Sequence, residues 1–379
     1  MSIEELRKEI DLIDDRISQL FIERMEKCKQ IGLIKSKNKL SVNAPLREKE
    51  IINRVTQNAD NEVKSYIKQL YENIFLLSKT YQNSYNVTQS NSVNKIRACL
   101  ENKKENMPTS ASVACQGVAG AYSSIAAEKL FSISNITYFK NFEGVFNAVD
   151  KGLCEFGILP IENSTAGSVL QVYDLMEKYN FYIVESVRLQ VSHVLAVKPG
   201  VERKDIKEIC SHDQALQQCA EYIKKFNYKT TAMQNTAIAG SYVAESDRND
   251  IAAICSEECA NIYGLKIIEK AIQDNPNNFT RFICISKNMK ILNGADKISV
   301  MTSLQNKPGS LNKMLSRFAA EGLNLSKIES RPIPNCQFEF MFYCDFSGDI
   351  ENQGVLNLMS ELDNNSDKFA FLGCYKEIV

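Results

Sequence analysis

Apolar residues recur every three or four positions through residues 1–82, which is the spacing of amphipathic helices. Ser2 and Glu5 form a capping-box pattern that opens a first helix running to about Lys39. A helix of this length spans roughly 55 Å, which two shorter following helices cannot cover within one chain. The pattern therefore predicts a helical block that dimerises through its first helix. The apolar seam of that helix consists of Ile3, Leu6, Ile10, Ile13, Ile17, Leu20, Cys28, Ile31 and Ile34.

Two cations share the apolar side of this first helix. Arg24 occupies the next position of the seam, and Lys35 lies about 20° from the same face at ~100° per residue. A single cation of this kind would extend its charged head to water. Here Arg47 and the neutral donors Ser78 and Gln82 of the third helix are expected near the same cavity. Clustered cations in an apolar seam need compensating charge, so the pattern favours a polyanionic ligand such as a small dicarboxylate.

The pattern changes twice further along the chain. Residues 83–110 are polar, rich in Asn and Ser and weakly patterned, which indicates a linker. From about residue 112 onward, short apolar runs alternate with helical patterns, which is typical of α/β organisation. The last part then shows a βαββαβ order, which is ferredoxin-like. Its predicted elements are strand 297–305, helix 309–321, strand 324–333, strand 337–346, helix 352–363 and strand 369–377.

Composition and charge argue against several classes of function. Lys+Arg 45 against Asp+Glu 46 gives a formal net charge of -1, which argues against a dedicated nucleic-acid or anionic-membrane binder. The 12 cysteines form no CxxC pair, and Cys255 and Cys259 have no histidine nearby, so no metal or other cofactor is expected. No apolar run reaches membrane length and the start does not resemble a signal peptide. We therefore expect a cytoplasmic protein with reduced cysteines.

Polar residues follow several strands of the central part and suggest a cleft that collects anionic groups. In "FGILPIENSTAGSV", Ser164 and Thr165 are placed to supply hydroxyl and N–H groups at a helix start. "SHDQALQQC" opens with a capping serine, Ser211, and "NTAIAGSYVAE" places Asn235 before a helix. The glycines of "CQGVAGAYS" suggest close backbone approach to an anion, although their spacing is not GxGxxG. Taken singly, each capping residue is most simply a helix cap.

Few charged or titratable residues are candidates for chemistry in this cleft. Arg281 stands at the mouth of the apolar run in "FTRFICIS", beside the hydroxyl of Thr280. A buried arginine without a partner is expensive, so Arg281 must meet either a dicarboxylate substrate or a carboxylate such as Glu162. His212 titrates near neutrality, but its place at a helix start favours capping or packing. His193 alternates with apolar residues and is expected to be structural.

Residues 3–85 resemble the all-helical chorismate mutase domain. The resemblance implies a pericyclic rearrangement of chorismate to prephenate, in which the enzyme holds a compact conformer and stabilises charge on the ether oxygen. It assigns three arginines to the substrate carboxylates, Lys35 and Gln82 to the ether oxygen, and Glu48 to the ring hydroxyl. The matching positions are Arg7, Arg24, Lys35, Arg47, Glu48, Ser78 and Gln82.

Two positions of this helical block bear on the resemblance. Arg7 lies about 100° from the Arg24 face, so it cannot readily serve the same cavity in its own chain. The resemblance implies that it serves the site of a dimer partner. Ala44 stands where the family usually has an aspartate. If only the backbone N–H matters there, little is lost; otherwise substrate affinity drops.

Residues 112–286 resemble prephenate dehydratase, on the motifs "PIENSTAGSV", "SHDQALQQC" and "NNFTRF" in this order. That family has two α/β lobes like those of periplasmic binding proteins, and it removes carbon dioxide and water from prephenate to give phenylpyruvate. The resemblance makes Thr280 the catalytic hydroxyl, as a positioned donor to the departing ring hydroxyl. Arg281 becomes a carboxylate partner or an organiser of the site. The implied pocket residues are Glu162, Asn163, Gln218, Ser123 and Ser164.

The segments "KPGSLNKML" and "KIESRP" resemble the regulatory ACT domain. The resemblance implies that L-phenylalanine binds at a dimer interface and inhibits the dehydratase. Ser310 stands where alanine is common, and the chain has no tryptophan, although the family often places one after the second segment. Gly309 permits close backbone approach to the amino acid. The implied regulatory residues are Gly309, Ser310, Leu311, Glu329, Ser330, Arg331 and Pro332.

Together these patterns predict a multidomain enzyme of L-phenylalanine biosynthesis. Chorismate and prephenate are its expected substrates, and a homodimer or homotetramer is its expected assembly. One alternative is a non-catalytic, amino-acid-sensing dimeric regulator, in which Thr280 and the cationic pocket would have no purpose. A mutase fused to a dehydrogenase would need a dinucleotide fingerprint, which the sequence lacks. The predicted domains are an all-α chorismate mutase dimer domain (1–85), a linker (86–111), a two-lobed α/β prephenate dehydratase domain (112–289) and an α+β ferredoxin-like ACT domain (297–379).

Overall fold

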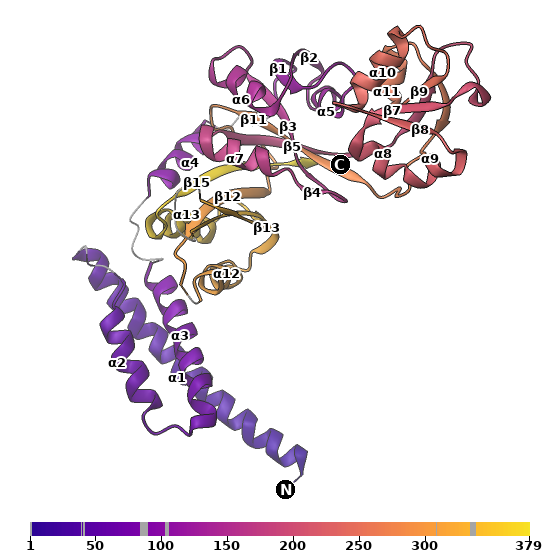
Figure 1. The fold of residues 1–379 in the computed structure, drawn as a ribbon. Helices are drawn as coiled ribbons and strands as arrows, with labels where there is room; N and C mark the ends of the chain where they lie inside the picture. Colours follow the sequence, from indigo (N-terminus) through magenta and orange to yellow (C-terminus); the bar gives the residue numbers. More distant parts are fainter. Residues whose placement is uncertain are drawn as a thin grey trace. The chain divides into compact units, whose positions relative to one another are not determined.

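The computed structural model describes residues 2–38, 40, 42–83, 90–102, 106–307, 309–333 and 339–379. The chain divides into two compact units, whose elements are labelled in Figure 1. Unit 1 comprises Met1–Lys95 and Val300–Ala370, and unit 2 comprises Ile96–Ser299 and Phe371–Val379. The boundaries between the units fall within helix α4 (Asn91–Glu101) and strands β12 (Lys297–Leu304) and β15 (Phe369–Tyr375).

Unit 1 begins with the predicted helical block. The capping box at its start is present, because the Ser2 hydroxyl accepts from the Glu5 N–H while the Glu5 carboxylate accepts from the Ser2 N–H at 2.7 Å. The first helix packs along the third, and Gly32 allows their close approach, since a Cβ there would lie 3.1 Å from the Gln82 Cα. The helices are α1 (Ile3–Lys37), α2 (Pro45–Thr56) and α3 (Asn61–Asn83).

The apolar seam of α1 is largely uncovered within one chain. Ile10, Ile17 and Leu20 are each more than half exposed. Large apolar side chains do not normally remain in water along six turns of helix, because about 25 cal/mol is lost for each Å² left unburied. The sequence pattern predicts that a second chain covers this face.

The last part of the chain has the predicted βαββαβ order. Its strands form a four-stranded sheet in the order β13-β14-β12-β15. Met314 and Phe318 of the first helix and Met359 of the second are buried in its core. Its elements are β12, α12 (Ser310–Ala320), β13 (Asn324–Pro332), β14 (Phe340–Ser347), α13 (Gln353–Asn365) and β15.

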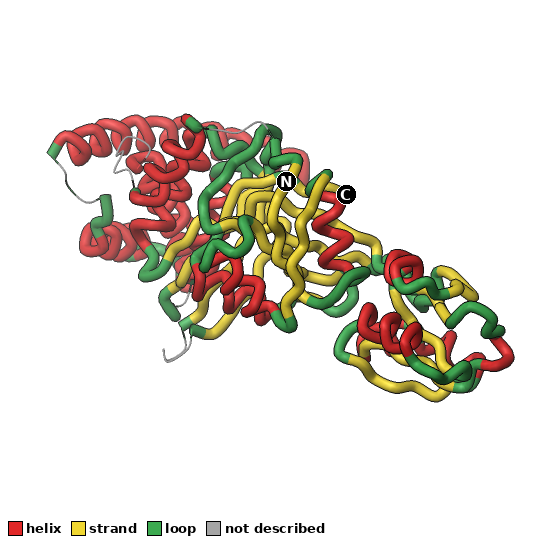
Figure 2. The backbone as a smooth tube through the Cα atoms, turned by 90° about the horizontal axis from the view of Figure 1, so that it is seen from above, coloured by secondary structure: helices red, strands yellow, loops and turns green. Residues whose placement is uncertain are grey.

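Unit 2 contains two α/β lobes, seen in Figure 2 as two separate groups of strands. The sheet of the first lobe has the order β16-β5-β11-β3-β1-β2, with β4 paired to β3. Strands β1, β2 and β3 are parallel, whereas β11 runs antiparallel to both of its neighbours. The elements of this lobe are β1 (Ser110–Gln116), α5 (Tyr122–Leu130), β2 (Ile133–Phe139), α6 (Phe142–Asp150), β3 (Phe156–Asn163), β4 (Gly167–Ser168), α7 (Leu170–Tyr179), β5 (Tyr182–Gln190), β11 (Phe279–Ser286) and β16 (Glu377–Ile378).

The second lobe has a five-stranded sheet in the order β10-β6-β9-β7-β8. The chain passes between the lobes twice, from β5 to β6 and from β10 to β11. The start of β11 therefore lies at the lobe junction, and it is paired there with the end of β3. The elements of this lobe are β6 (Val194–Val197), η1 (Arg203–Asp205), β7 (Glu208–His212), α8 (Asp213–Gln218), α9 (Ala220–Phe226), β8 (Lys229–Met233), α10 (Thr236–Glu245), β9 (Ile251–Cys255), α11 (Glu257–Ile262) and β10 (Lys266–Lys270).

The structure corrects three local predictions. The segment predicted as a linker contains α4, whose Val93 and Ile96 are buried; two apolar residues three positions apart were too short a signal. Ser211 does not cap α8, because its hydroxyl donates to the Ile254 carbonyl at 2.6 Å, and His212 caps the helix instead. Ser164 lies in a turn before β4 and not at a helix start. The cap at Asn235 is confirmed.

Candidate active sites

Arg24 and Ser78 meet inside the helical block of unit 1. The Arg24 guanidinium donates to the Ser78 hydroxyl between α1 and α3, and its carbon lies 6.0 Å from the centroid of the Phe75 ring. The Ser78 hydroxyl in turn donates to the Ile74 carbonyl at 2.5 Å. A cation of α1 is thus held against a buried neutral group of α3.

Gln82 extends this polar strip by one turn of α3. Its side chain is buried, and its Oε1 has no hydrogen-bond partner among the described residues. A buried amide oxygen without a partner has capacity for a ligand or a water. Lys35 lies one turn beyond Gly32, the residue of α1 that meets Gln82, and its ammonium donates to the Val42 carbonyl at 3.0 Å.

The other predicted residues of this site have different partners or are exposed in a single chain. Arg47 pairs with Glu50 at 3.0 Å, with its side chain 62% exposed. Glu48 pairs with Lys79 at 3.0 Å, and both are only partly exposed. Arg7 is exposed near the start of α1. The polar strip therefore consists of Arg24, Lys35, Ser78 and Gln82. Within the described residues, Arg7, Arg47 and Glu48 make no hydrogen bond or ion pair with these four.

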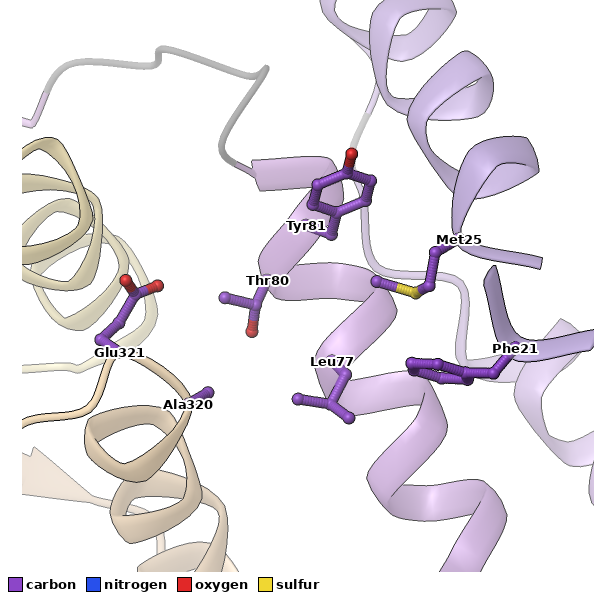
Figure 3. Close-up of a pocket in the computed structure, with 7 residues that line it drawn as sticks. All are labelled: Phe21, Met25, Leu77, Thr80, Tyr81, Ala320 and Glu321. Atoms are coloured by element: carbon purple, nitrogen blue, oxygen red, sulfur yellow. The ribbon is translucent and has the colours of Figure 1, made fainter. Parts of the chain in front are cut away.

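A cavity of about 250 Å³ in unit 1 lies beside this strip (Figure 3). Its walls are mostly apolar and contain the carboxylate of Glu321 but no cation. It is therefore unsuited to a dicarboxylate. None of the predicted site residues lines it; its lining residues are Phe21, Met25, Leu77, Thr80, Tyr81, Ala320 and Glu321.

Asn163 and Thr280 meet at the lobe junction of unit 2. They stand opposite each other where β3 pairs with β11, and the Asn163 Nδ2 lies 2.9 Å from the Thr280 Oγ1. The Asn163 Oδ1 accepts from the backbone N–H groups of Thr165 and Ala166 at 3.0 and 2.8 Å. These two bonds fix the orientation of the amide, so Nδ2 is the group that faces the threonine. Because Oγ1 already accepts from Asn163, the hydroxyl proton of Thr280 is free to be donated elsewhere.

Asn278 is a third polar residue of this junction, and it was not singled out from the sequence. It is 1% exposed, and its Oδ1 accepts from the Asn163 Nδ2 at 2.7 Å. Its Nδ2 has no partner among the described residues. The signal was its place in "NNFTRF", two residues before Thr280. An oriented, buried donor of this kind suits a carboxylate or hydroxyl of a ligand.

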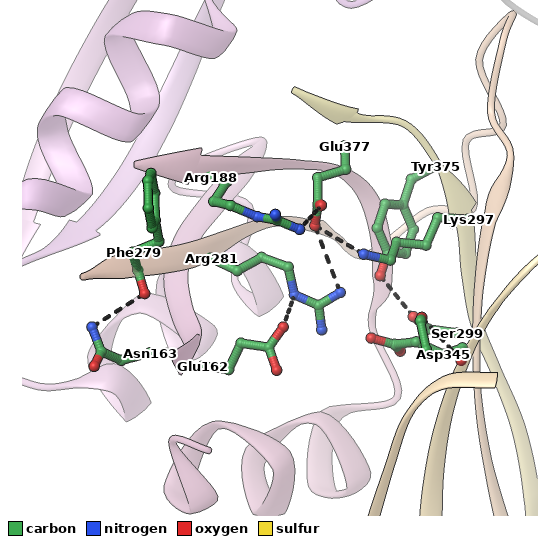
Figure 4. A network of polar contacts seen from close by, with 11 residues as sticks. Glu162, Asn163, Arg188, Phe279, Arg281, Lys297, Ser299, Asp345, Tyr375 and Glu377 are labelled. Carbon is green, nitrogen blue, oxygen red and sulfur yellow. Dashed lines mark hydrogen bonds and ion pairs between the residues drawn. The ribbon is translucent and has the colours of Figure 1, made fainter. Parts of the chain in front are cut away.

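Arg281 is paired with a carboxylate of the chain. Its Nε lies 2.8 Å from the Glu162 Oε1, and its Nη1 lies 3.9 Å from the Glu377 Oε2 (Figure 4). Arg281 thus contacts Glu162, one of the two partners considered from the sequence. Since side chains alternate along a strand, Arg281 and Thr280 project from opposite faces of the sheet.

Gln218 faces the crossing from the first lobe to the second. Its Oε1 lies 2.9 Å from the Nε2 of His193, which is buried. Burial lowers the pKa of His193, and the Gln218 contact raises it by a smaller amount, so the imidazole is neutral near pH 7. The Tyr122 hydroxyl donates to the Ser192 carbonyl at 2.8 Å beside it. The contact with His193 fixes the Gln218 side chain, while the buried Nδ1 of His193 has no hydrogen-bond partner among the described residues.

Three further candidates have local structural partners. The Ser123 hydroxyl donates to the Gln116 carbonyl at 2.6 Å. The Ser164 hydroxyl accepts from the Phe279 N–H at 2.9 Å and so ties the turn after β3 to the start of β11. His212 accepts from the Gln214 N–H at 3.3 Å as a helix cap.

The glycine segment before α5 approaches protein and not an anion. A Cβ on Gly120 would lie 2.7 Å from the Cys259 Cα of the second lobe, and the Ser256 hydroxyl donates to the Gly120 carbonyl at 2.9 Å. Gly120 also has a φ of +81°, which favours glycine. The missing Cβ and the left-handed backbone of Gly120 therefore both allow the two lobes to contact each other.

The predicted regulatory residues lie at one end of α12 and along β13. Gly309 caps α12 with a φ of +83°, and Ser310 and Leu311 open that helix. Glu329, Ser330, Arg331 and Pro332 end β13, which is an edge strand of the sheet. An edge strand has free backbone groups and tolerates proline.

Two other kinds of feature are absent from the part of the chain that the structure describes. No group of three or more His, Cys, Asp or Glu side chains that could hold a metal ion occurs within the described ranges. In the same part of the chain, no helix is both long enough and apolar enough to span a membrane.

Comparison with known proteins follows the two parts of the chain described above. Residues 6–83 match the family model of type II chorismate mutase, and residues 113–290 match that of prephenate dehydratase. The chain is 30% identical to the "Bifunctional chorismate mutase/prephenate dehydratase" of Aquifex aeolicus, over 98% of this chain and 97% of that protein. It is 34% identical to "Arogenate dehydratase/prephenate dehydratase 2, chloroplastic" of Arabidopsis thaliana, over 89% of this chain and 86% of that protein.

A solved structure agrees with these relatives. Prephenate dehydratase from Arthrobacter aurescens, in complex with L-Phe, superposes with a TM-score of 0.65 at 29% identity, over 70% of this chain and 90% of that one. Fold and sites together define an enzyme of aromatic amino-acid biosynthesis with a helical mutase part and a two-lobed dehydratase part. The chain belongs to the family of bifunctional chorismate mutases/prephenate dehydratases. It rearranges chorismate to prephenate and converts prephenate to phenylpyruvate, which rules out the purely sensory alternative.

Proposed function

We propose that the Asn163–Thr280 pair is the catalytic centre of the dehydratase. Loss of the prephenate carboxylate as carbon dioxide leaves an electron pair in the ring, and the C–O bond to the ring hydroxyl breaks. The departing hydroxide takes the Thr280 proton and leaves as water, and the threonine oxygen regains a proton from solvent water. The main support for this proposal is the hydrogen bond that the Asn163 amide donates to the Thr280 oxygen. Because the oxygen accepts that bond, the threonine proton can be donated to the departing group. Asn278 and Gln218 supply polar contacts to the rest of the substrate.

The roles of the remaining pocket residues follow from their contacts. Glu162 neutralises Arg281, which makes the arginine an organiser of the site and not a direct carboxylate ligand. Ser164 fixes the turn that leads to the catalytic asparagine, and Ser123 holds the segment between β1 and α5. Domain boundaries near 1–85, 112–289 and 297–379 suit this division of labour, with binding-protein-like lobes closing on prephenate.

For the mutase, we propose that substrate completes the polar strip of α1 and α3. Arg24 is fixed by Ser78 to bind one carboxylate, and Lys35 and Gln82 approach the ether oxygen. Arg47 and Glu48 leave their partners Glu50 and Lys79 when chorismate arrives. The exposed Arg7 and the exposed seam of α1 support a dimer, or a tetramer built from dimers, in which Arg7 serves the partner's site.

One experiment tests both activities. Purified protein is given chorismate without any cofactor, and phenylpyruvate is followed by its absorbance after addition of base. We expect prephenate to appear first and phenylpyruvate to follow. Gln82→Ala should block chorismate use while supplied prephenate is still consumed. Failure of the unaltered protein to convert supplied prephenate would contradict the proposed dehydratase centre.

Arogenate is a second candidate substrate, because a relative at 34% identity has both substrates in its name. Arogenate has an amino group where prephenate has a side-chain keto oxygen. The same assay with arogenate, read as phenylalanine formed, decides between one substrate and two.

We also propose that L-phenylalanine inhibits the dehydratase through the C-terminal sheet. The left-handed Gly309 at the start of α12 and the edge strand β13 offer backbone groups to an amino acid. The structure of the Arthrobacter relative with L-Phe supports this proposal. Addition of increasing L-phenylalanine should lower the dehydratase rate. An unchanged rate at millimolar L-phenylalanine would contradict the proposed regulation.

A further inference from the structure

Glu377, on the last strand of unit 2, faces three cations. Its carboxylate contacts the guanidinium of Arg188, and it lies 2.9 Å from the Lys297 ammonium and 3.9 Å from the Arg281 guanidinium (Figure 4). Glu377 is 14% exposed and Arg281 only 4%. Nothing in the sequence motifs of the dehydratase pointed to this residue.

Strand pairing places these groups on one face of the sheet. Glu377 stands opposite Ser186 of β5, two residues before Arg188, and Arg188 stands opposite Arg281 of β11. Arg281 in turn stands opposite Glu162 of β3. Side chains at alternate positions share a face, so the row runs Glu377, Arg188, Arg281 and Glu162 across four neighbouring strands.

Two arginines directly opposite each other on adjacent strands repel. Arg281 is too deeply buried for water to screen that repulsion. Glu377 lies against both guanidinium groups and compensates them together. Without its charge, nothing would offset the repulsion between Arg188 and the Nη1 side of the Arg281 guanidinium. That group would turn from its present position, in which Nη1 faces Glu377 and Nε contacts Glu162.

The contact between Arg281 and Glu162 lies next to the catalytic pair. Glu162 precedes Asn163 on β3, and Arg281 follows Thr280 on β11. The register of these strands shifts immediately after Arg281, so the regular ladder does not hold this end by itself. The ion pair at 2.8 Å secures the rung beside the Asn163–Thr280 rung.

We propose that Glu377 is a positioning residue of the dehydratase, which holds Arg281 on Glu162 and thereby fixes the Asn163–Thr280 geometry. It acts from a strand outside the segment that matches the dehydratase family model, 113–290. The inference rests on the proposed catalytic centre. The test uses Arg188→Gln to restore the rate lost in Glu377→Gln. That restoration depends on Arg188 and Glu377 alone, so its failure can be told apart from failure of the proposed catalytic centre.

The test compares three variants with prephenate as substrate. Glu377→Gln should lower kcat about tenfold with KM nearly unchanged, because the residue does not touch substrate. Arg188→Gln should stay within about twofold of the unaltered enzyme, since Arg188 is 43% exposed and its loss relieves Arg281. The double variant should be about threefold or more faster than Glu377→Gln alone, because the repulsion is gone.

Mutase activity of the same preparations is the folding control and should not change. If the Glu377→Gln variant loses mutase activity, the Glu377→Asp variant is used instead. Its carboxylate keeps the charge but lies farther from the two arginines, and Arg188→Gln should again restore the dehydratase rate. A kcat for Glu377→Gln within about twofold of the unaltered enzyme overturns the proposal. So does a double variant no faster than the single one, which is the outcome expected if Glu377 only braces its strand.

Discussion

At the scale of single residues, the dehydratase site depends on the alternation of side chains along β11. Thr280 and Arg281 are neighbours in sequence, yet one meets Asn163 and the other meets Glu162 on opposite faces of the sheet. The hydroxyl and the charge therefore have different tasks. In the proposed site, the hydroxyl serves the substrate and the charge secures the strand pair that carries it.

Removal of the Thr280 hydroxyl tests the first task. Thr280→Val keeps the branched shape but cannot donate, so the dehydratase kcat should fall by about 10²-fold. Thr280→Ser retains the hydroxyl and should keep most activity. Stopped assays with prephenate measure both rates, with mutase activity as the internal control. A serine variant with little activity beside a valine variant with most of it would contradict proton donation.

Buried His193 gives a second prediction at this scale, concerning pH. Burial lowers its pKa, so as pH falls the imidazole is protonated in the unfolded chain before it is protonated in the folded chain. Its contribution to stability is present above the ordinary histidine pKa and is lost as pH falls. His193→Asn, which stays neutral, should lose less Tm between about pH 7.5 and about pH 5.5 than the unaltered protein. Equal losses measured by calorimetry would contradict this.

At the scale of elements, the mutase strip is set by how closely α1 and α3 approach. Gly32 has no Cβ, and the backbone of Gln82 fills the space that one would occupy. Lys35, one turn later on α1, is brought to the same end of α3. Helix periodicity placed these residues on facing sides, whereas the small residue between them sets the distance.

Gly32→Ala should therefore affect catalysis more than stability. Its Cβ would lie 3.1 Å from the Gln82 Cα and 3.3 Å from the Gln82 carbonyl oxygen, so the helices must separate slightly. Overpacking of about 1 kcal/mol is offset by a similar gain in helix propensity. We expect mutase kcat to fall about fivefold through displacement of Gln82, with an unchanged dehydratase rate. The control is Gln30→Ala on the exposed side of α1, and equal mutase rates for both variants would contradict this reading.

At the scale of the whole molecule, the dimer proposed from the exposed seam of α1 would make assembly part of the mutase site. Ile13 and Ile17 are both more than half exposed although they belong to the apolar face. Arg7 precedes them on the same helix and has no place in the site of its own chain. An apolar face and a displaced arginine on one element point to the same second chain.

A charge within this seam should separate the subunits along α1. Ile13→Asp should weaken association by at least about tenfold, because a carboxylate would be buried without a partner. The mutase rate should fall with it, since Arg7 of the partner is withdrawn. Sedimentation across a concentration series measures the first effect. Lys8→Glu, on the opposite side of the helix, is the control, and full mutase activity in a dissociated Ile13→Asp variant would contradict a shared site.

The sequence by itself determined the periodic elements and named the residues that we propose carry chemistry. Three features are local patterns that can be predicted from residue spacing alone. They are the helical block, the βαββαβ order of the last part and the motif around Thr280. Helix α4 was not predicted because only two buried apolar residues mark it. The capping roles predicted for Ser164 and Ser211 were wrong because both hydroxyls bond to residues distant in sequence.

Tertiary structure alone decided which partners meet. The choice of Glu162 for Arg281, the orphaned donor of Asn278 and the place of Glu377 all depend on strands that are distant in sequence and adjacent in the sheet. A sequence pattern repeats with the period of its own element, so it reports which side of that element is buried. It contains no information on the register between strands, and register is what sets a carboxylate opposite an arginine.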